Sequence, residues 1–317
     1  MDRITELEAL IALAETGSFS AAARQLNRSP ATMTRLIASL EARLDLSLVA
    51  RSTRRVALTE PGERFVGEAR RVLTAMMEAE DAARGASGRI AGNFTLTAPV
   101  LFGEMFVAPL LRDYLERWPD VRAKLVLTDR VVDMLEEGVD LALRIGTLSQ
   151  AGLTARKVGN VRAVVVASPD YLARFGFPET PADLSRHRIV ATETGGDLPG
   201  ATGPLSWSFE NESDRKTALL MPRLTVSSIR SAIDAARAGF GIARTLSYQV
   251  ADPLMSGGLV ELLASFETRR QPVSLVHRYG QRAPARVRTF IDFTTAALAR
   301  QRHRLDGNVH ADSQKHE

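Results

Sequence analysis

Residues 15–35 read ETGSFSAAARQLNRSPATMTR, and the local signals in this stretch decide the fold of the N-terminal region. Upstream of it, one apolar stripe at helical spacing is formed by Leu7, Leu10, Ile11 and Ala14. Gly17 is the residue type that commonly ends a helix, because glycine adopts a left-handed backbone without strain. Ser18 can cap a second helix, which we expect over 21–26.

The second half of this stretch predicts a third helix over 30–43. Asn27-Arg28 forms a tight turn, Ser29 can cap the helix, and Pro30 fits its first turn, where a missing N–H costs nothing. The predicted buried stripe consists of Met33, Leu36, Ile37, Leu40 and Leu44. Two short helices joined by a tight turn are typical of a helix-turn-helix, although ordinary three-helix packing units share this pattern.

Small polar residues and arginine lie on the predicted outer face of this third helix. Only the first turns of a helix reach base edges in the major groove, and close approach requires short side chains with a few hydrogen-bonding groups. The expected groove contacts are Ser29, Ala31, Thr32, Thr34 and Arg35.

Residues 48–51 and 55–58 read as two short strands, which form an arginine-tipped hairpin or wing. We expect Arg51, Thr53 and Arg54 on this wing to contact the DNA backbone. Residues 24–55 hold seven arginines against two acids, a net charge of +5, while the whole chain carries +4. Positive charge is therefore concentrated where the wing and the helix-turn-helix lie.

These motifs resemble the LysR-type transcriptional regulators. The resemblance rests on ETGSFSAAA at 15–23, SPATMTR at 29–35, RSTRR at 51–55 and LTEPG at 58–62. Asp45, Val49 and Pro61 depart from the family, which usually has glycine, phenylalanine and alanine there. The resemblance implies a winged helix-turn-helix DNA-binding domain, which we place at 1–58.

The next segment, 59–88, predicts a long helix followed by a hinge. Phe65, Ala69, Val72, Met76, Ala79 and Ala83 form a heptad-like apolar seam. Such a helix can pair with a second copy or pack on its own chain. Pairing suits DNA binding, since two reading helices must lie about one duplex turn apart. The resemblance also implies homodimers that often pair into homotetramers. Residues 84–88 read as a flexible hinge.

Strand-like segments, such as 93–98, 124–128, 140–145 and 162–167, alternate with helix-like segments, such as 131–137, over 89–300. This alternation predicts an α/β domain with mostly parallel strands, which we place at 89–305. Its length allows two lobes, one at about 89–160 plus 268–300 and the other at about 161–267. LEEGVDLALRIG at 135–146 and ASPDYL at 167–172 resemble the effector-binding domain of the same family, whose architecture resembles periplasmic solute-binding proteins. The predicted fold class is thus multidomain α+β. Residues 306–317 read as a disordered tail, and the Gly/Pro-rich segment 193–206 has no assigned role.

Two strand-to-helix turns predict an effector site, because ligands of open α/β sheets lie beside helix N-termini at the carboxyl ends of strands. The candidate effector contacts are Ala98, Pro99, Val100, Leu101, Arg144, Thr147, Thr192, Trp207, Ser227 and Ser228. Serine and threonine at such turns often serve only as helix caps, and a tryptophan is more often a core residue.

The composition excludes several other classes. The 317 residues contain no cysteine, so disulfides, thiolate metal sites and cysteine nucleophiles are ruled out. No phosphate-loop, zinc-protease or serine-hydrolase motif appears, and we expect no catalytic site, metal or cofactor. Neither a membrane span nor a signal peptide is apparent, which predicts a cytoplasmic location without a membrane partner.

We therefore expect a transcriptional regulator whose partners are double-stranded DNA, a second copy of the chain and a small-molecule effector, with RNA polymerase a further candidate. An effector would change the spacing or angle of DNA-binding dimers through unequal affinity for two quaternary states. The alternative is a ligand-independent regulator whose second region serves only oligomerisation.

Overall fold

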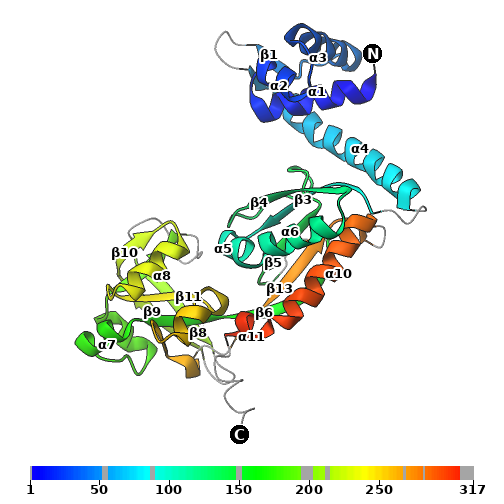
Figure 1. Cartoon of the computed structure of the whole chain (residues 1–317). Coiled ribbons are helices and arrows are strands. Elements are labelled where there is room, and N and C mark those ends of the chain that lie inside the picture. Colours follow the sequence, from blue (N-terminus) through cyan, green and yellow to red (C-terminus); the bar gives the residue numbers. More distant parts are fainter. Residues whose placement is uncertain are drawn as a thin grey trace. The chain divides into compact units, whose positions relative to one another are not determined.

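The computed structural model describes residues 2–51, 56–85, 90–147, 152–193, 203–210, 215–266, 269–280 and 283–307. These residues form two compact units (Figure 1). The first unit contains 1–92 together with 132–140, and the second contains 93–131 and 141–317. Each unit has hydrophobic core residues of its own.

The first unit has the predicted winged helix-turn-helix. Its elements are α1 (Arg3–Thr16), α2 (Phe19–Gln25), α3 (Pro30–Leu44), β1 (Val49–Arg51), β2 (Val56–Leu58) and α4 (Glu60–Gly85). Strands β1 and β2 pair antiparallel. The three short helices bury a common core that includes Leu10, Leu13, Met33, Ile37 and Leu40, each at most 1% exposed.

The ends of these helices follow from local side-chain chemistry. Gly17 has a φ of 62° and its N–H donates to the carbonyl of Leu13, so α1 ends there. The Ser18 side chain accepts from the N–H of Ala21 and caps α2. Asp45 has a φ of 53°, and its presence where the family usually has glycine is accommodated because aspartate tolerates the left-handed region better than most residues.

Helix α4 is 26 residues long, which corresponds to about 39 Å. In its first half, Val66 and Ala69 pack into the core of the first unit. Farther along, Val72 and Met76 are exposed. Arg84 and Gly85, predicted to begin a hinge, form the last turn of this helix instead. The remaining predicted hinge residues, 86–88, lie outside the described residues.

The second unit contains one large sheet with helices packed against it. Its strands are β3 (Gly92–Ala98), β4 (Val121–Leu127), β5 (Leu141–Ile145), β6 (Thr154–Ala167), β7 (Ile189–Thr192), β10 (Pro222–Val226), β11 (Ile242–Leu246), β12 (Val260–Leu262) and β13 (Arg270–His277). The strand order is β10-β7-β11-β6-β13-β5-β3-β4, with β12 also paired to β6. Strands β8 (Leu205–Glu210) and β9 (Arg215–Leu220) form a separate antiparallel hairpin.

The helices of the second unit connect these strands. They are α5 (Val100–Phe102), η1 (Gly103–Val107), α6 (Ala108–Arg117), α7 (Pro169–Phe175), η2 (Pro181–Arg186), α8 (Ile229–Arg237), η4 (Ser247–Gln249), α9 (Ala251–Met255), η5 (Ala264–Phe266), α10 (Ala285–Arg300) and α11 (Arg302–Asp306). The first three run on without a break, because Gly103 and Ala108 keep helical backbone angles. Segment 103–107 is a π-helical turn within this longer helix.

The sheet is mixed, so the prediction of mostly parallel strands was wrong. Strand β7 pairs parallel with β10 and β11, and β3 pairs parallel with β5. Strand β6 pairs antiparallel with β11, β12 and β13. This long strand continues from the part of the sheet around β13 into the part around β11, with the change of partner between Arg162 and Ala163. We refer to the parts on either side of this point as lobe one, which contains β3, β4 and β5, and lobe two, which contains β7, β10 and β11.

Two further local predictions were wrong. The predicted helix near 131–137 is a series of turns, in which the Asp133 carboxylate accepts from the N–H groups of Leu135 and Glu136. A left-handed Gly138 follows. The predicted disordered tail from 306 begins too early, since Asp306 ends helix α11 and only residues 308–317 lie outside the described residues.

Among the helices that the structure describes, none is long and apolar enough to cross a membrane.

Candidate functional site

Helix α3 presents the predicted DNA-reading surface. Ala31, Thr34 and Arg35 are exposed along its outer face, while Thr32 is half-buried. The Ser29 hydroxyl accepts from the N–H of Thr32 at 3.1 Å, so this residue also fixes the start of the helix. A helix capped by its own serine holds its first turns rigid and accessible, which is the geometry that a major groove requires.

The arginines of this region divide into two groups. Arg35, Arg24 and Arg28 are exposed, and none of their guanidinium groups has a hydrogen-bond or ion-pair partner among the described residues. Arg43 instead donates to the carboxylate of Glu6 at 2.7 Å and ties α3 to α1. The charge count from sequence therefore included one arginine whose role is structural.

Glu6 is a buried carboxylate within the first unit, with 2% of the residue exposed. The Ser39 hydroxyl and the Arg43 guanidinium each donate to it at 2.7 Å. Burial acts to raise the pKa of Glu6, but these two hydrogen bonds outweigh it and the pKa lies below its ordinary value. The sequence pattern did not single out this group.

The described residues include both strands of the predicted wing. Arg51 ends β1 opposite Val56 of β2. Thr53 and Arg54 lie outside the described residues. Gly62, at the start of α4, lies directly against the wing, since a Cβ at this position would come within 2.1 Å of the Leu48 carbonyl oxygen.

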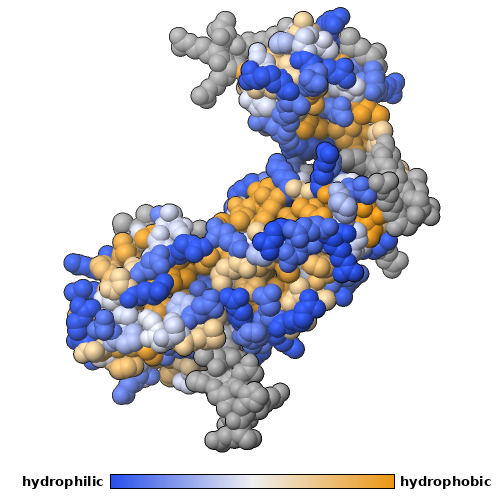
Figure 2. Space-filling model, viewed as in Figure 1, coloured by the Kyte–Doolittle hydropathy of each residue, from blue (hydrophilic) through white to orange (hydrophobic). Residues whose placement is uncertain are grey.

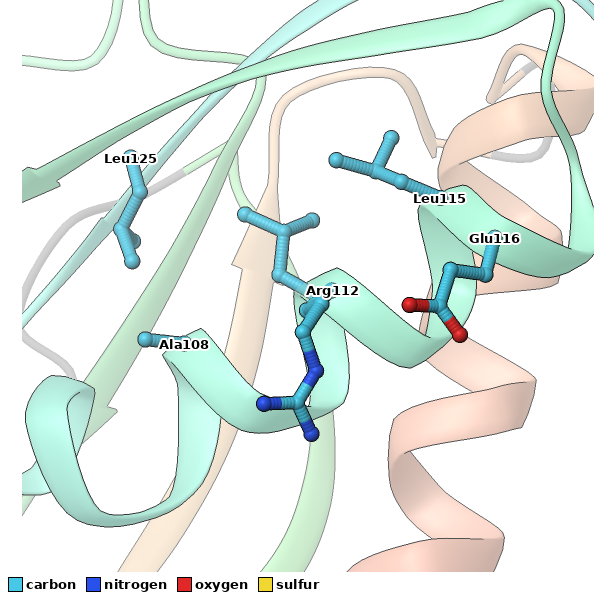
Figure 3. A pocket seen from close by; sticks show the side chains of 6 residues that line it. Ala108, Arg112, Leu115, Glu116 and Leu125 are labelled. Atoms are coloured by element: carbon cyan, nitrogen blue, oxygen red, sulfur yellow. The ribbon is translucent and has the colours of Figure 1, made fainter.

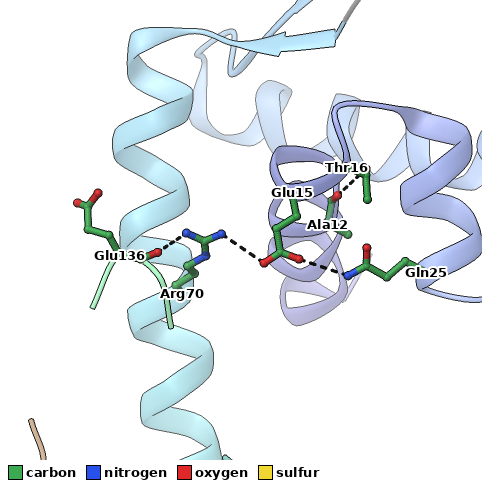
Figure 4. Close-up of polar contacts among 6 residues, drawn as sticks. All are labelled: Ala12, Glu15, Thr16, Gln25, Arg70 and Glu136. Carbon is green, nitrogen blue, oxygen red and sulfur yellow. Dashed lines mark hydrogen bonds and ion pairs between the residues drawn. The ribbon is translucent and has the colours of Figure 1, made fainter. Parts of the chain in front are cut away.

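Arg70 on α4 joins the long helix to the helix-turn-helix (Figure 4). Its guanidinium donates to the Glu15 carboxylate of α1 at 3.3 Å, and that carboxylate also accepts from Gln25 of α2 at 3.3 Å. Arg70 donates as well to the backbone carbonyl of Glu136, in the segment 132–140 that packs with this unit. These contacts fix the orientation of α4 against α1 and α2.

The second unit carries a shallow apolar groove between α6 and β4 (Figure 3). The groove has a volume of about 490 Å³ and is lined by Ala108, Leu111, Arg112, Leu115, Glu116 and Leu125. The space-filling view shows apolar surface around β4, bordered by hydrophilic surface along α6 (Figure 2). Arg112 and Glu116 lie one turn apart along the exposed side of α6, so opposite charges flank an apolar strip.

The first predicted ligand turn, 98–101, lies where β3 meets the long helix that begins at α5. Ala98 and Leu101 are buried, and Pro99 and Val100 are half-buried. The N–H of Val100, which sequence reasoning left open for a ligand, instead donates to the Asp129 carboxylate at 3.1 Å. Asp129 thus supplies the negative charge that a helix N-terminus favours.

Tyr248 lies close to this turn although it is more than a hundred residues away in sequence. Its ring contacts Phe102 and Phe106, with centroid distances of 5.0 and 5.9 Å. Burial raises the pKa of Tyr248 and the negative charge of Asp129 adds to the shift, so the phenol stays protonated. The Gln249 amide donates to the Tyr248 hydroxyl at 3.1 Å.

The second predicted ligand turn, 227–228, precedes α8, which contacts the helical segment that follows the first turn. Leu101 and Ile233 belong to one core cluster, and Glu104 forms an ion pair with Arg230. Ser227 and Ser228 are exposed before α8, and Ser228 makes no side-chain capping bond. Thr192 is also at this edge, since it pairs with Val226 in the sheet.

The remaining predicted contacts lie in different surroundings. Arg144, at the end of β5, donates to the carbonyl of Arg130 at 3.4 Å and so lies beside the Asp129 turn. Thr147 is exposed two residues beyond β5. Trp207 is 3% exposed in a core cluster of lobe two, with the Arg244 guanidinium 5.9 Å from its ring. Trp207 therefore does not join the two turns.

Two histidines of this unit, His187 and His277, are half-buried and buried, respectively. Burial lowers the pKa of both His187 and His277. The His187 ring lies 3.3 Å from the Tyr171 hydroxyl. Across the part of the chain that the structure describes, no group of three or more His, Asp and Glu side chains is placed to hold a metal ion.

Comparison with known proteins identifies both units. Residues 4–63 match the bacterial regulatory helix-turn-helix family of lysR type, and residues 87–299 match the LysR substrate binding domain. The chain is 31% identical to the HTH-type transcriptional regulator PtxR of Pseudomonas aeruginosa over 302 residues, which is 95% of each chain. It is 30% identical to the regulator CrgA of Neisseria meningitidis over 294 residues, 92% of this chain and 96% of the relative.

Solved structures match most of the chain. The structure of CrgA from Neisseria meningitidis matches with a TM-score of 0.59 and 29% identity, covering 94% of this chain and 99% of that one. A full-length variant of AphB matches with a TM-score of 0.66 and 26% identity, covering 93% and 98%. Both family models and these relatives lead to one conclusion, that the chain belongs to the LysR family of transcriptional regulators.

Proposed function

We propose that this regulator binds double-stranded DNA through the first turns of α3, and that a small molecule bound by the second unit modulates it. The observation that carries the DNA-binding proposal is the exposed strip Ala31, Thr34 and Arg35 on a helix capped by Ser29. Short side chains permit close approach to base edges, and Arg35 supplies the planar donor group that suits guanine.

Other residues of the first unit would anchor the protein on the phosphates. Arg24 and Arg28 lie exposed near the start of α3, and they join the predicted backbone contacts of the wing, Arg51, Thr53 and Arg54. Contacts of this kind give affinity without sequence information. Thr32, whose hydroxyl lies 2.9 Å from that of Ser29, would contribute to the groove contact less directly than Arg35.

We propose that the active form is a homodimer, with further pairing into a tetramer. The exposed Val72 and Met76 on α4 support pairing of this helix with its copy. The α6–β4 groove supports a second contact between copies, because an antiparallel α6 pair would bring Arg112 of one protomer to Glu116 of the other. Dimerisation would also set the two α3 helices one duplex turn apart.

The effector would bind beside the turns at 98–101 and 227–228. The Asp129 carboxylate already accepts from the N–H of Val100, so a carboxylate ligand would have to displace Asp129 to bind there. A hydroxyl or amine of the ligand could instead donate to the Asp129 carboxylate. We therefore propose that the effector presents a hydrogen-bond donor to Asp129. Arg144 and the exposed Ser227 and Ser228 would contact its remaining groups.

A footprint on the DNA upstream of the protein's own gene tests the DNA-binding proposal. The wild-type protein should protect a partly palindromic site, with affinity falling steeply as salt rises. Arg35→Ala should lower the ratio of specific to non-specific affinity by about 5- to 150-fold, as expected for a base contact of about 1–3 kcal/mol. The matched control is Arg300→Ala, an exposed arginine at the end of α10.

An unchanged ratio in Arg35→Ala would contradict the assignment of α3 as the reading helix. The alternative function, a regulator without a ligand, is favoured if no compound raises the melting temperature of the full chain. A screen with matched pairs, such as benzylamine and benzoate, tests this alternative together with the preference for a donor group.

A further inference from the structure

Helix α11 follows α10, the last helix of lobe one, and it is held to lobe two. Leu305 of this short helix is fully buried. Its backbone carbonyl accepts a hydrogen bond of 2.5 Å from the hydroxyl of Ser247, in the turn η4 that follows β11. The C-terminal end of the described chain therefore contacts an element that belongs to the other lobe.

The Ser247 hydroxyl serves two segments at once. Besides donating to Leu305, its oxygen accepts from the backbone N–H of Arg162 at 3.2 Å. Arg162 lies on β6 at the point where this strand changes partner between β13 and β11. Ser247 has no exposed surface, so loss of this hydroxyl would remove a hydrogen bond from each of two backbone groups at a buried position. One side chain thus joins the crossing strand, lobe two and α11.

Two glycines make this close packing possible. A Cβ at Gly159 of β6 would come within 2.8 Å of Leu305 Cδ1. At Gly307, which has a φ of 66°, a Cβ would come within 2.7 Å of the Ser247 Cβ. Leu305 thus packs closely against β6, and the residue after α11 packs closely against η4. A side chain at either glycine would prevent this packing.

Charged groups add contacts around the buried ones. Arg304 donates to both oxygens of Asp252 on α9, at 3.0 and 3.2 Å. Asp306 accepts from Arg270 at the start of β13, at 3.3 Å. Partly exposed ion pairs stabilise little by themselves. They nevertheless add contacts between α11 and two neighbours, which are α9 of lobe two and β13 near the point where β6 changes partner.

We propose that α11 is a brace that fixes the angle between the two lobes. Lobe one is joined to α11 through α10, whose Phe290 contacts Phe94 of β3 at a centroid distance of 5.4 Å. A rotation of the lobes about the β6–β13 crossing would have to pull Leu305 from its site and break the Ser247 bond. Ser247, which holds α11, directly precedes Tyr248, and the Tyr248 ring packs on Phe102 just after the turn at 98–101, so lobe angle and ligand site are linked through η4.

The absence of cysteine from the chain allows a direct test with spin labels. Ala296→Cys on α10 and Glu179→Cys in lobe two are both exposed positions for a label pair. The distance distribution is measured by pulsed electron resonance, with labelled chains diluted into unlabelled protein so that only distances within a protomer contribute. The distribution is compared for the intact chain, for Ser247→Ala and for a chain that ends at Gln301.

The intact chain should give one narrow distance. Ser247→Ala and the chain ending at Gln301 should each give a broader or shifted distribution, and exchange of the Arg162 amide hydrogen should rise roughly 3- to 10-fold in Ser247→Ala. Ser256→Ala, which removes an exposed hydroxyl that donates to Pro253, and a chain ending at Gly307 serve as matched controls that should retain the narrow distance.

An unchanged distance distribution in Ser247→Ala would overturn the proposal. So would a rise in amide exchange throughout both lobes, since that would make α11 a general part of the core rather than a brace between lobes. If the shorter chain does not fold, Ser247→Ala alone decides. None of these outcomes depends on an effector, so failure of the brace and failure of the proposed effector site are distinguishable.

Discussion

The candidate DNA contacts lie on one exposed helix, whereas the candidate effector site is assembled from turns that are distant in sequence. Helix α3 needs only a cap at Ser29 and a buried stripe to hold Arg35 in place. In the second unit, the fold of the whole domain brings Asp129 to the N–H of Val100 and close enough to Tyr248 to raise its pKa. A surface helix can lose a contact residue without losing structure, but a site made of turns uses the same groups for binding and for folding.

The largest expected effect on stability is at the junction between the wing and α4, in the unit that also carries the exposed helix α3. Gly62→Ala would place a Cβ 2.1 Å from the Leu48 carbonyl oxygen, so the wing or α4 must shift. We expect a loss of about 3 kcal/mol in the free energy of unfolding of the first unit. Thermal unfolding and DNA affinity measure this loss.

Gly67→Ala in the same helix is the control for that substitution. Its Cβ would meet only the Glu136 carboxylate, at an ordinary 3.6 Å. Alanine also has a better helix propensity than glycine by about 1 kcal/mol, so this variant should be as stable as wild type or more so. If both variants behaved alike, the close contact with Leu48 would have no part in holding the wing.

A smaller effect is expected from the buried carboxylate that ties α1 to α3. Glu6→Gln removes the negative charge that accepts from Ser39 and Arg43, and we expect a loss of about 1–3 kcal/mol at neutral pH. The exposed pair Arg64–Glu60 on α4 provides the contrast, since Glu60→Gln should change stability by well under about 1 kcal/mol.

The pH dependence of this effect has a definite sign. Because the pKa of Glu6 is lower in the folded protein than the ordinary 4.5, its contribution is complete above the unfolded pKa. That contribution is lost as the pH falls through the folded pKa. Urea unfolding of wild type and Glu6→Gln should therefore give curves that differ at pH 7 and converge in acid. A constant difference across this range would contradict the ionic role of Glu6.

The two units also differ in how far sequence predicts them. In the first unit the signals are local, such as Gly17, Ser18 and the Ser29-Pro30 pair, and the helices lie within two residues of the predicted ends. In the second unit the strands were mostly located, but the predicted helix at 131–137 was wrong. The alternation of strands and helices favoured a helix there, whereas Asp133 bonds to nearby N–H groups and stabilises a turn.

The surroundings of the candidate effector site could be predicted only in part, for a related reason. The turns at 98–101 and 227–228 follow from strand-to-helix transitions, and an ion pair between Glu104 and Arg230 joins the helices that follow them. Asp129 and Tyr248 could not be associated with them from sequence, since no local pattern brings residues so far apart into contact. Trp207 was included for its chemistry, yet its burial follows from alternation along β8, which places Leu205, Trp207 and Phe209 on one face.

Asp129→Asn tests the candidate effector site with a side chain of nearly the same size, so it changes the charge of this site and leaves α3 untouched. The amide oxygen can still accept from Val100, but the charge that favours a helix N-terminus is lost, so we expect a cost of about 0.3–1 kcal/mol. Affinity for DNA in the absence of ligand should not change. The melting-temperature rise produced by an amine ligand should become smaller in this variant. The rise produced by a carboxylate ligand of the same shape should become larger. Equal responses to both ligands would contradict the proposed contact.

The smallest expected effect is at a phosphate anchor on the exposed surface. Arg28→Ala removes one positive charge from the turn before α3 without touching the core, so stability should stay within about 0.5 kcal/mol of wild type. The slope of log affinity against log salt should decrease in magnitude by about 0.9, while the order of preference among DNA sequences stays the same. Arg35→Ala should differ from Arg28→Ala by producing a marked change in the order of preference among DNA sequences. If Arg28→Ala altered the preference instead, the reading surface would extend beyond α3 into the turn, and the division between anchoring and reading residues would lie elsewhere.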